Sequence, residues 1–279
     1  MSRARVGFGM HPRWLGEGDA SAFLEPLREQ GLAALEFELD GQDPHWPHCP
    51  PLMATCRRLG FELCFHAPYR GAYNIAGFAG RERRRLEAVI GPLLEVAVGH
   101  APAVIVVHGA RSPSRPQPAL REDTAAFLQW LLARYPGLRP ALENLAPAAG
   151  VTKIGSDRAS LLGIVAEIGD PRLGICWDVG HDLKAGQAGP PPGAWLAAVR
   201  HVHIHDLDER GVDHYPLLYG RVEPRSCLRP LIGAGYAGIV TLELKGEQLA
   251  HLWPERLPGV LAQSVRALAQ AIGRAQDRP

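Results

Sequence analysis

Paired cysteines and long apolar runs are both missing from this sequence. Its 5 cysteines are an odd number and form no C-x-x-C pair, which argues against a disulfide framework and a cysteine zinc site. No window approaches the roughly 18 uninterrupted apolar residues of a membrane span, and the first residues carry no long apolar segment, so neither a span nor a secretion signal is indicated. The sequence therefore predicts a cytoplasmic protein with reduced thiols.

An excess of charge of one sign is also missing. Lys plus Arg number 30 and Asp plus Glu number 29, which leaves a net charge of +1. This balance creates no global field that attracts nucleic acid or an anionic membrane. It argues against both as partners, although a local patch can still be basic. The oligomeric state is left open, a homo-oligomer included.

A glycine-rich dinucleotide fingerprint is absent as well. Gly7-Phe8-Gly9 lies within the first strand-like run and lacks the third glycine at the required spacing. This argues against a two-domain doubly wound protein that binds a dinucleotide. No organic cofactor is expected.

What the sequence does contain is a regular alternation of short apolar runs and longer amphipathic segments. Strand-like runs cover residues 5–10, 33–39, 62–68, 103–109, 139–145, 173–180, 200–206 and 238–244. Helix-like segments follow at residues 19–30, 49–59, 80–98, 118–135, 157–168, 193–199, 224–232 and 255–272. Asp19 and Asp157 stand where N-caps are expected. Eight consecutive β-then-α units predict an α/β fold, a single (β/α)8 TIM barrel formed by one domain over residues 1–279.

The stretch Arg-His-Val-His-Ile-His-Asp at residues 200–206 contains three alternating histidines. The two-residue period of a strand places His201, His203 and His205 on one face and the β-branched residues on the other. This pattern is typical of a strand whose outer face packs on helices and whose inner face borders a polar cavity.

Acidic or imidazole side chains occur at the ends of seven consecutive strand-like runs. They are Glu36, Glu38, His66, His108, Glu143, Asp178 with the following His181, His203 with His205, and Glu243. Barrel enzymes build their sites at the carboxyl ends of the strands, so these side chains are expected to converge on one pocket. Because burying so many ionisable groups without compensation would be costly, the set predicts a divalent metal ion, manganese, cobalt, magnesium or zinc.

Six short motifs together resemble the xylose isomerase-like TIM barrels, the superfamily that includes sugar 3-epimerases, dehydratases and endonuclease IV. The motifs are His66-Ala67-Pro68-Tyr69, Val107-His108-Gly109, Leu142-Glu143-Asn144, Trp177-Asp178-Val179-Gly180-His181, Val202-His203-Ile204-His205-Asp206 and the run Gly-Ile-Val-Thr-Leu-Glu at residues 238–243. They follow the order that the superfamily has, which implies its barrel fold.

The resemblance also implies roles for individual residues. Glu143, Asp178, His203 and Glu243 match the four ligands of the single metal ion in the isomerases and epimerases, where the two glutamates also move protons. His181 matches a histidine that contacts the substrate or, in endonuclease IV, a zinc ion. His66, His108 and His214 match further zinc ligands of endonuclease IV, and His205 and Asp213 are candidate additional metal or substrate positions where the sequence departs from the family pattern.

The leading hypothesis is a metal-dependent isomerase or epimerase of a small hydroxy-carbonyl compound, such as a ketose or its phosphate, with Glu143 and Glu243 as the proton-transferring pair. Residues that could contact this carbohydrate-like substrate are Glu36, Glu38, Arg70 and Asn74. The alternatives are a multi-zinc phosphodiester hydrolase like endonuclease IV, acting on abasic DNA, and a dehydratase of the same superfamily.

Overall fold

Eight parallel strands form a closed barrel, as the sequence predicts. The computed structural model describes residues 3–15, 18–187, 190–252 and 256–276. The barrel strands are β1 (Arg5–Gly9), β2 (Leu32–Glu38), β3 (Glu62–His66), β4 (Ala103–Val107), β6 (Leu138–Glu143), β8 (Gly174–Asp178), β9 (Val199–Ile204) and β10 (Ile239–Leu242). Their order around the barrel is β1-β10-β9-β8-β6-β4-β3-β2. Chain order is therefore preserved around the ring, and the last strand pairs with the first.

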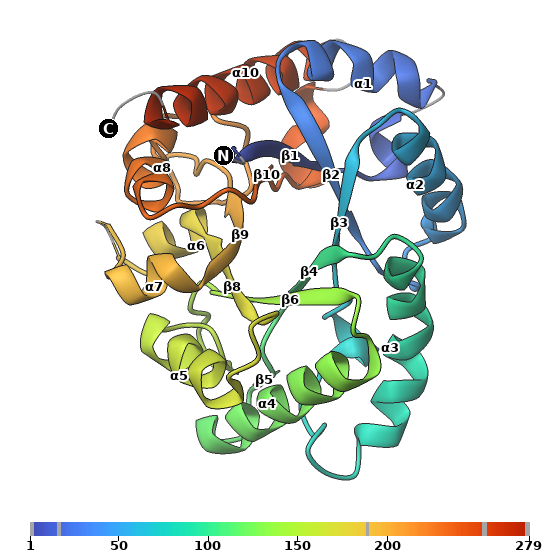
Figure 1. Ribbon diagram of the computed structural model, residues 1–279, viewed down its shortest axis with the longest axis vertical. Coiled ribbons are helices and arrows are strands. Elements are labelled where there is room, and N and C mark those ends of the chain that lie inside the picture. Colours follow the sequence, from blue (N-terminus) through green and yellow to red (C-terminus); the bar gives the residue numbers. More distant parts are fainter. Residues whose placement is uncertain (1–2, 16–17, 188–189, 253–255, 277–279) are drawn as a thin grey trace.

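Helices surround the strands and cover their outer faces (Figure 1). They are α1 (Ala20–Glu29), α2 (Cys49–Arg58), α3 (Arg83–Val98), α4 (Gln117–Arg134), α5 (Arg158–Ile168), α6 (Val179–Lys184), α7 (Gly193–Ala198), α8 (Pro224–Gly233), α9 (Gly246–Leu249) and α10 (Leu257–Gln276). The predicted N-caps are confirmed, because Asp19 accepts from two backbone amides of α1 and Asp157 accepts from Ser160. The predicted start of the last helix, Glu255, lies outside the described residues. Among the described helices, none combines the length and apolar character that crossing a membrane requires.

Small apolar side chains fill the lower part of the barrel interior. Ala34, Cys64 and Ile239 form one buried cluster, and Val106, Ala141 and Cys176 form another. Along each strand, the next inward side chain is polar, because inward positions recur every two residues. The register places Glu36 beside Cys64 and His203 beside both Thr241 and Asp178. Polar side chains are thereby collected at the carboxyl ends of the strands.

Two local features differ from the sequence prediction. The sixth strand was predicted to continue to Gly180, but β8 ends at Asp178 and α6 begins at once. The cause is the Asp178 carboxylate, which accepts a 2.6 Å hydrogen bond from the backbone N–H of His181 and so caps the helix. A small antiparallel sheet, β5 (Arg111–Ser112) with β7 (Thr152–Lys153), was not predicted. It joins the loops that follow β4 and β6 above the barrel.

Candidate metal centre and active site

Four side chains from three strands and one strand end meet at the top of the barrel. Glu143 of β6, Asp178 of β8, His203 of β9 and Glu243 just after β10 each offer one atom, and these atoms all lie within 4.8 Å of one another. His203 Nδ1 is 3.3 Å from Glu243 Oε2 and 3.7 Å from Glu143 Oε1. The structure thus brings together the four residues that the sequence resemblance implied as ligands.

Unpartnered buried atoms within this group test whether it suits a cation. Glu143 Oε1, His203 Nδ1 and Glu243 Oε2 are buried and have no hydrogen-bond partner among the described residues. Buried polar atoms are normally paired, and leaving three of them unpaired in one place is costly. Three carboxylates and one imidazole form a donor set that suits manganese, cobalt or zinc. The residues present therefore fit a divalent metal ion.

Glu36 holds the imidazole of His203 in place from below. Its Oε1 lies 2.9 Å from His203 Nε2, and its Oε2 lies 2.7 Å from His201 Nε2. Burial raises the pKa of Glu36, but the charges of His203 and His201 outweigh it and hold the pKa well below its usual range. A carboxylate on the far nitrogen of a histidine fixes the ring and its tautomer, which leaves Nδ1 of His203 directed at the four-residue group.

A first group of histidines flanks the centre on the side of β3 and β4. His66 Nε2 and His108 Nε2 lie 3.2 Å and 2.9 Å from Glu143 Oε2, so both imidazoles share one carboxylate oxygen. Burial lowers the pKa of His108 to about 4, although Glu143 opposes the shift. A neutral imidazole can accept a proton or a metal ion, and His66, His108 and Glu143 together form a further group of potential ligands.

A second group of histidines, His181, His205 and His214, flanks the centre on the side of β8 and β9. His181 Nδ1 lies 3.2 Å from Asp178 Oδ2 and 3.3 Å from Glu143 Oε1. His214 is the one non-glycine residue with positive φ (63°) in the described part of the chain, a strained conformation typical of functional sites. A Cβ atom on Gly180 would overlap the His205 imidazole, so only glycine fits at that position of α6.

The cavity beside these groups has two parts. A space of about 350 Å³ is bordered by Glu143, His181, His214 and Glu243, and a narrower space of about 110 Å³ is bordered by Glu36, Glu38 and His66. Both parts are bordered by Arg70 and Glu243. The candidate substrate contacts Glu36, Glu38 and Arg70 thus border the cavity, with Glu36 more deeply buried than Glu38.

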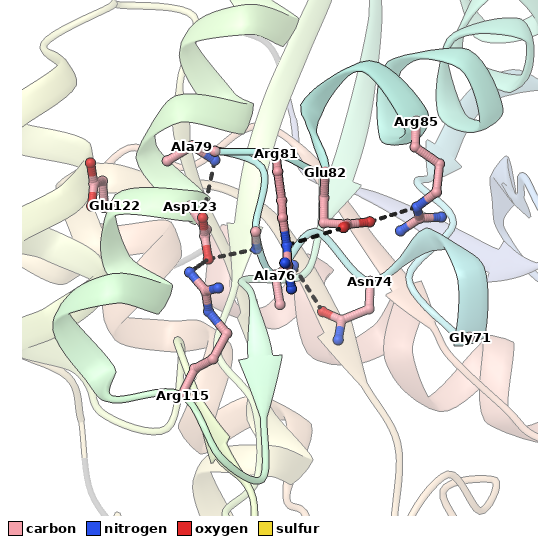
Figure 2. A pocket seen from close by; sticks show the side chains of 12 residues that line it. Gly71, Asn74, Ala76, Ala79, Arg81, Glu82, Arg85, Arg115, Glu122 and Asp123 are labelled. Atoms are coloured by element: carbon pink, nitrogen blue, oxygen red, sulfur yellow. Dashed lines mark hydrogen bonds and ion pairs between the residues drawn. The ribbon is translucent and has the colours of Figure 1, made fainter.

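Asn74 and Asp213 are placed away from the four-residue group. Asn74 borders a separate pocket of about 460 Å³ (Figure 2), and its amide donates a 2.8 Å hydrogen bond to the Arg111 carbonyl. Asp213 borders the larger part of the cavity, where it accepts a 2.7 Å hydrogen bond from Lys184 Nζ and lies 3.9 Å from His214 Nε2. Their contacts indicate that Asn74 fixes the backbone of β5 and Asp213 binds a lysine.

Two supporting residues were not assigned roles from the sequence. Asn144 donates a 2.8 Å hydrogen bond to the Asp178 carbonyl and accepts a 2.7 Å bond from the Asp178 amide, so it fixes the end of β8. The Tyr69 ring packs against His108 with 3.9 Å between the ring centroids. Both stand inside the quoted motifs, directly after Glu143 and three residues after His66. Their positions next to strand-end residues in these motifs were the sequence feature that could have indicated their supporting roles.

The fold and this centre together define a TIM barrel with a metal-capable cluster at the carboxyl ends of its strands. The chain matches the family described as xylose isomerase-like TIM barrel over residues 24–271, and it belongs to that family. A relative from Methanocaldococcus jannaschii, an uncharacterised protein, is 27% identical over 235 residues, which cover 80% of this chain and 78% of the relative.

Solved structures of similar fold include sugar epimerases. A D-tagatose 3-epimerase-like protein superposes with a TM-score of 0.69 at 22% identity and 98% coverage of both chains. A D-psicose 3-epimerase from Clostridium cellulolyticum H10, solved with D-tagatose, superposes with a TM-score of 0.68 at 13% identity, covering 98% of this chain and 100% of the other. At these identities the likeness establishes the fold.

Proposed function

We propose that this protein is a divalent-metal-dependent isomerase or epimerase of a small hydroxy-carbonyl compound of the ketose type. The observation that carries the proposal is the pair of buried carboxylate oxygens, Glu143 Oε1 and Glu243 Oε2, that lack hydrogen-bond partners beside His203 Nδ1. The similarity to epimerases that act on ketoses supports the same chemistry. Glu143, Asp178, His203 and Glu243 would hold the metal ion.

The reaction needs a proton to leave one carbon and another to arrive. A bound divalent ion supplies Lewis-acid polarisation of the carbonyl and neighbouring hydroxyl oxygens, which makes the adjacent carbon more acidic. One of the two glutamates takes the proton from that carbon, and the other returns a proton. His181, 3.3 Å from Glu143 Oε1, orients the substrate oxygens. Glu36 keeps His203 in the tautomer that the centre needs.

The proposal is tested by carbon-bound hydrogen exchange with solvent. The metal-loaded protein is incubated in D2O with D-tagatose, D-psicose, L-ribulose and their phosphates, the metal is removed, and proton NMR is recorded. We expect deuterium at the carbon beside the carbonyl of at least one compound, together with its epimer or isomer. No incorporation with any member of the panel would contradict the proposal. A product lacking a hydroxyl group would instead indicate dehydration, which begins with the same proton removal.

A second candidate function is favoured by the two flanking histidine groups. His66 and His108 with Glu143, and His181 with His205 and His214, could each hold an additional ion. A centre of two or three zinc ions is typical of phosphodiester hydrolases, which activate water between metals. Cleavage of an oligonucleotide that contains one abasic site, with no deuterium exchange in ketoses, would favour this hydrolase over the isomerase.

A further inference from the structure

Lysine is rare in this chain and is concentrated at one place. The sequence has 30 Lys and Arg residues, yet only three are lysines, Lys153, Lys184 and Lys245. All three border the cavity of about 350 Å³ that also contains Glu143 and Glu243. They lie in the three connections that follow β6, β8 and β10: in β7, at the end of the short helix α6 and directly before α9. The barrel therefore collects every lysine of the sequence beside its candidate active site.

The small sheet β5–β7 pairs two like charges at the border of this cavity. Arg111 and Lys153 are directly opposite each other in the antiparallel register, an arrangement that destabilises a sheet. Within the described part of the chain neither forms an ion pair: Lys153 Nζ donates to the Ala146 carbonyl at 3.0 Å and Arg111 Nη2 to the Tyr69 carbonyl at 3.5 Å. Burial, with the charges of Arg111 and Lys184, lowers the pKa of Lys153.

The other two lysines are only partly neutralised. Asp213 lies 2.7 Å from Lys184 Nζ and 3.9 Å from Lys245 Nζ, so two ammonium groups share one carboxylate as their ion-pair partner. Glu143 and Glu243 also border the cavity, but their oxygens belong to the metal-capable group. If a cation neutralises those carboxylates, the loops above them keep an excess of positive charge that a ligand can satisfy.

We propose that these loops hold the phosphate group of a sugar phosphate, with Arg111 and Lys153 as its principal contacts and Lys184 and Lys245 reinforcing them. The proposal rests on the proposed function and narrows its substrate class from ketoses in general to ketose phosphates. A phosphate monoester carries about −1.5 to −2 charges at pH 7 and three acceptor oxygens, which suits one guanidinium fork and more than one ammonium group. A single carboxylate would need fewer cations.

The test is isothermal titration of the metal-loaded protein with inorganic phosphate, sulfate and acetate. Sulfate is included because it resembles phosphate in shape and charge but is a poor metal ligand. We expect saturable binding of phosphate and sulfate, weakened about tenfold or more in Arg111→Met and Lys153→Met, since each variant removes one charge-assisted contact. The matched control is Arg81→Met, an exposed arginine paired with Glu82 away from this cavity.

Thermal stability provides a second measurement, which distinguishes a binding role of Arg111 and Lys153 from a structural one. If the two residues only stabilised the fold, their replacement would lower the midpoint of thermal unfolding. Because Arg111 and Lys153 repel each other across the sheet, removing one charge is expected to leave the midpoint of thermal unfolding unchanged or raised. Sulfate binding that is equal in wild type, both variants and Arg81→Met would overturn the phosphate site, as would tighter binding of acetate than of sulfate.

The proposed reaction and the phosphate site can fail separately. Deuterium exchange in neutral ketoses with equal sulfate binding in all variants would overturn the phosphate site and leave the isomerase standing. Variant-sensitive sulfate binding without exchange in any ketose or ketose phosphate would support the anion site and overturn the isomerase. If both proposals hold, ketose phosphates are expected to have a lower KM than the corresponding ketoses, and Lys153→Met should remove that difference.

Discussion

Replacement of Glu243 by glutamine is expected to slow deuterium exchange at the substrate carbon by about 10²–10⁴-fold, the usual contribution of a general acid or base. The amide has nearly the same shape and keeps an oxygen that could face a cation held beside His203 Nδ1, which lies 3.3 Å from Glu243 Oε2. It cannot take up or release the proton. Burial raises the pKa of Glu243, but His203 and His214 outweigh it and keep the carboxylate charged, as a base must be.

The control for this substitution is Glu95→Gln, which removes an exposed carboxylate paired with Arg134 on the outer helices. Its exchange rate should equal that of the wild type. The metal content of Glu243→Gln has to be measured in the same samples, because the residue is also proposed as a ligand. An exchange rate in Glu243→Gln equal to the control's, with metal retained, would exclude Glu243 from proton transfer.

Removal of the metal is expected to abolish exchange and to destabilise the protein. Without a cation, the carboxylates of Glu143, Asp178 and Glu243 stay close together in a buried centre, where Glu143 Oε1 and Glu243 Oε2 have no hydrogen-bond partner among the described residues. A ligand that binds only the folded state stabilises it by about 4 kcal/mol at 1,000 times its Kd. For a chain of this size, the midpoint of thermal unfolding should fall on the order of 10 °C after dialysis against a chelator.

Manganese or cobalt added back should restore both the exchange rate and the unfolding midpoint. Differential scanning calorimetry on untreated, chelator-treated and reconstituted samples measures the change. Magnesium serves as a comparison, since a hard ion prefers oxygen ligands and should restore less at a centre that includes an imidazole. Identical midpoints in all samples would argue against any tightly bound ion at this centre.

The barrel and the meeting of the strand ends followed from simple periodicity. Alternation along each strand fixes which side chains face inward, and parallel strands end on the same side of a barrel. Glu143, Asp178 and His203 stand at or near strand ends for this reason, and the structure has them within one group. A closed ring of eight consecutive βα units needs no information from the loops, so the barrel topology could be predicted, whereas the end of β8 and the β5–β7 sheet could not.

The depth of each side chain in the barrel could not be predicted in the same way. Glu36 and Glu38 share a strand face in the sequence, yet Glu36 is buried between His201 and His203, whereas Glu38 is only partly buried. That depth depends on the stagger of neighbouring strands, and register shifts occur between β1 and β2 and between β8 and β9. Alternation within a strand contains no information about its stagger against the next one.

The conformations of the loops could not be predicted from the sequence either. Asp213 is next to His214 in sequence, but it is held by Lys184 at the end of α6 and by Lys245 directly before α9. His214 beside the centre has a backbone with positive φ, and the neighbouring residues in the sequence do not predict this conformation. The pairing of Arg111 with Lys153 likewise joins loops that are far apart in the chain. These contacts are tertiary, and the proposed phosphate site depends on them.

The most direct test of the central claim is the number of metal ions that each chain binds. Elemental analysis of the purified protein, loaded with manganese, cobalt or zinc and freed of excess ion, gives this number. One ion per chain, lost in a His203→Ala variant, is the result predicted for a single centre formed by Glu143, Asp178, His203 and Glu243. Three zinc ions per chain, or none, would contradict a single-metal isomerase.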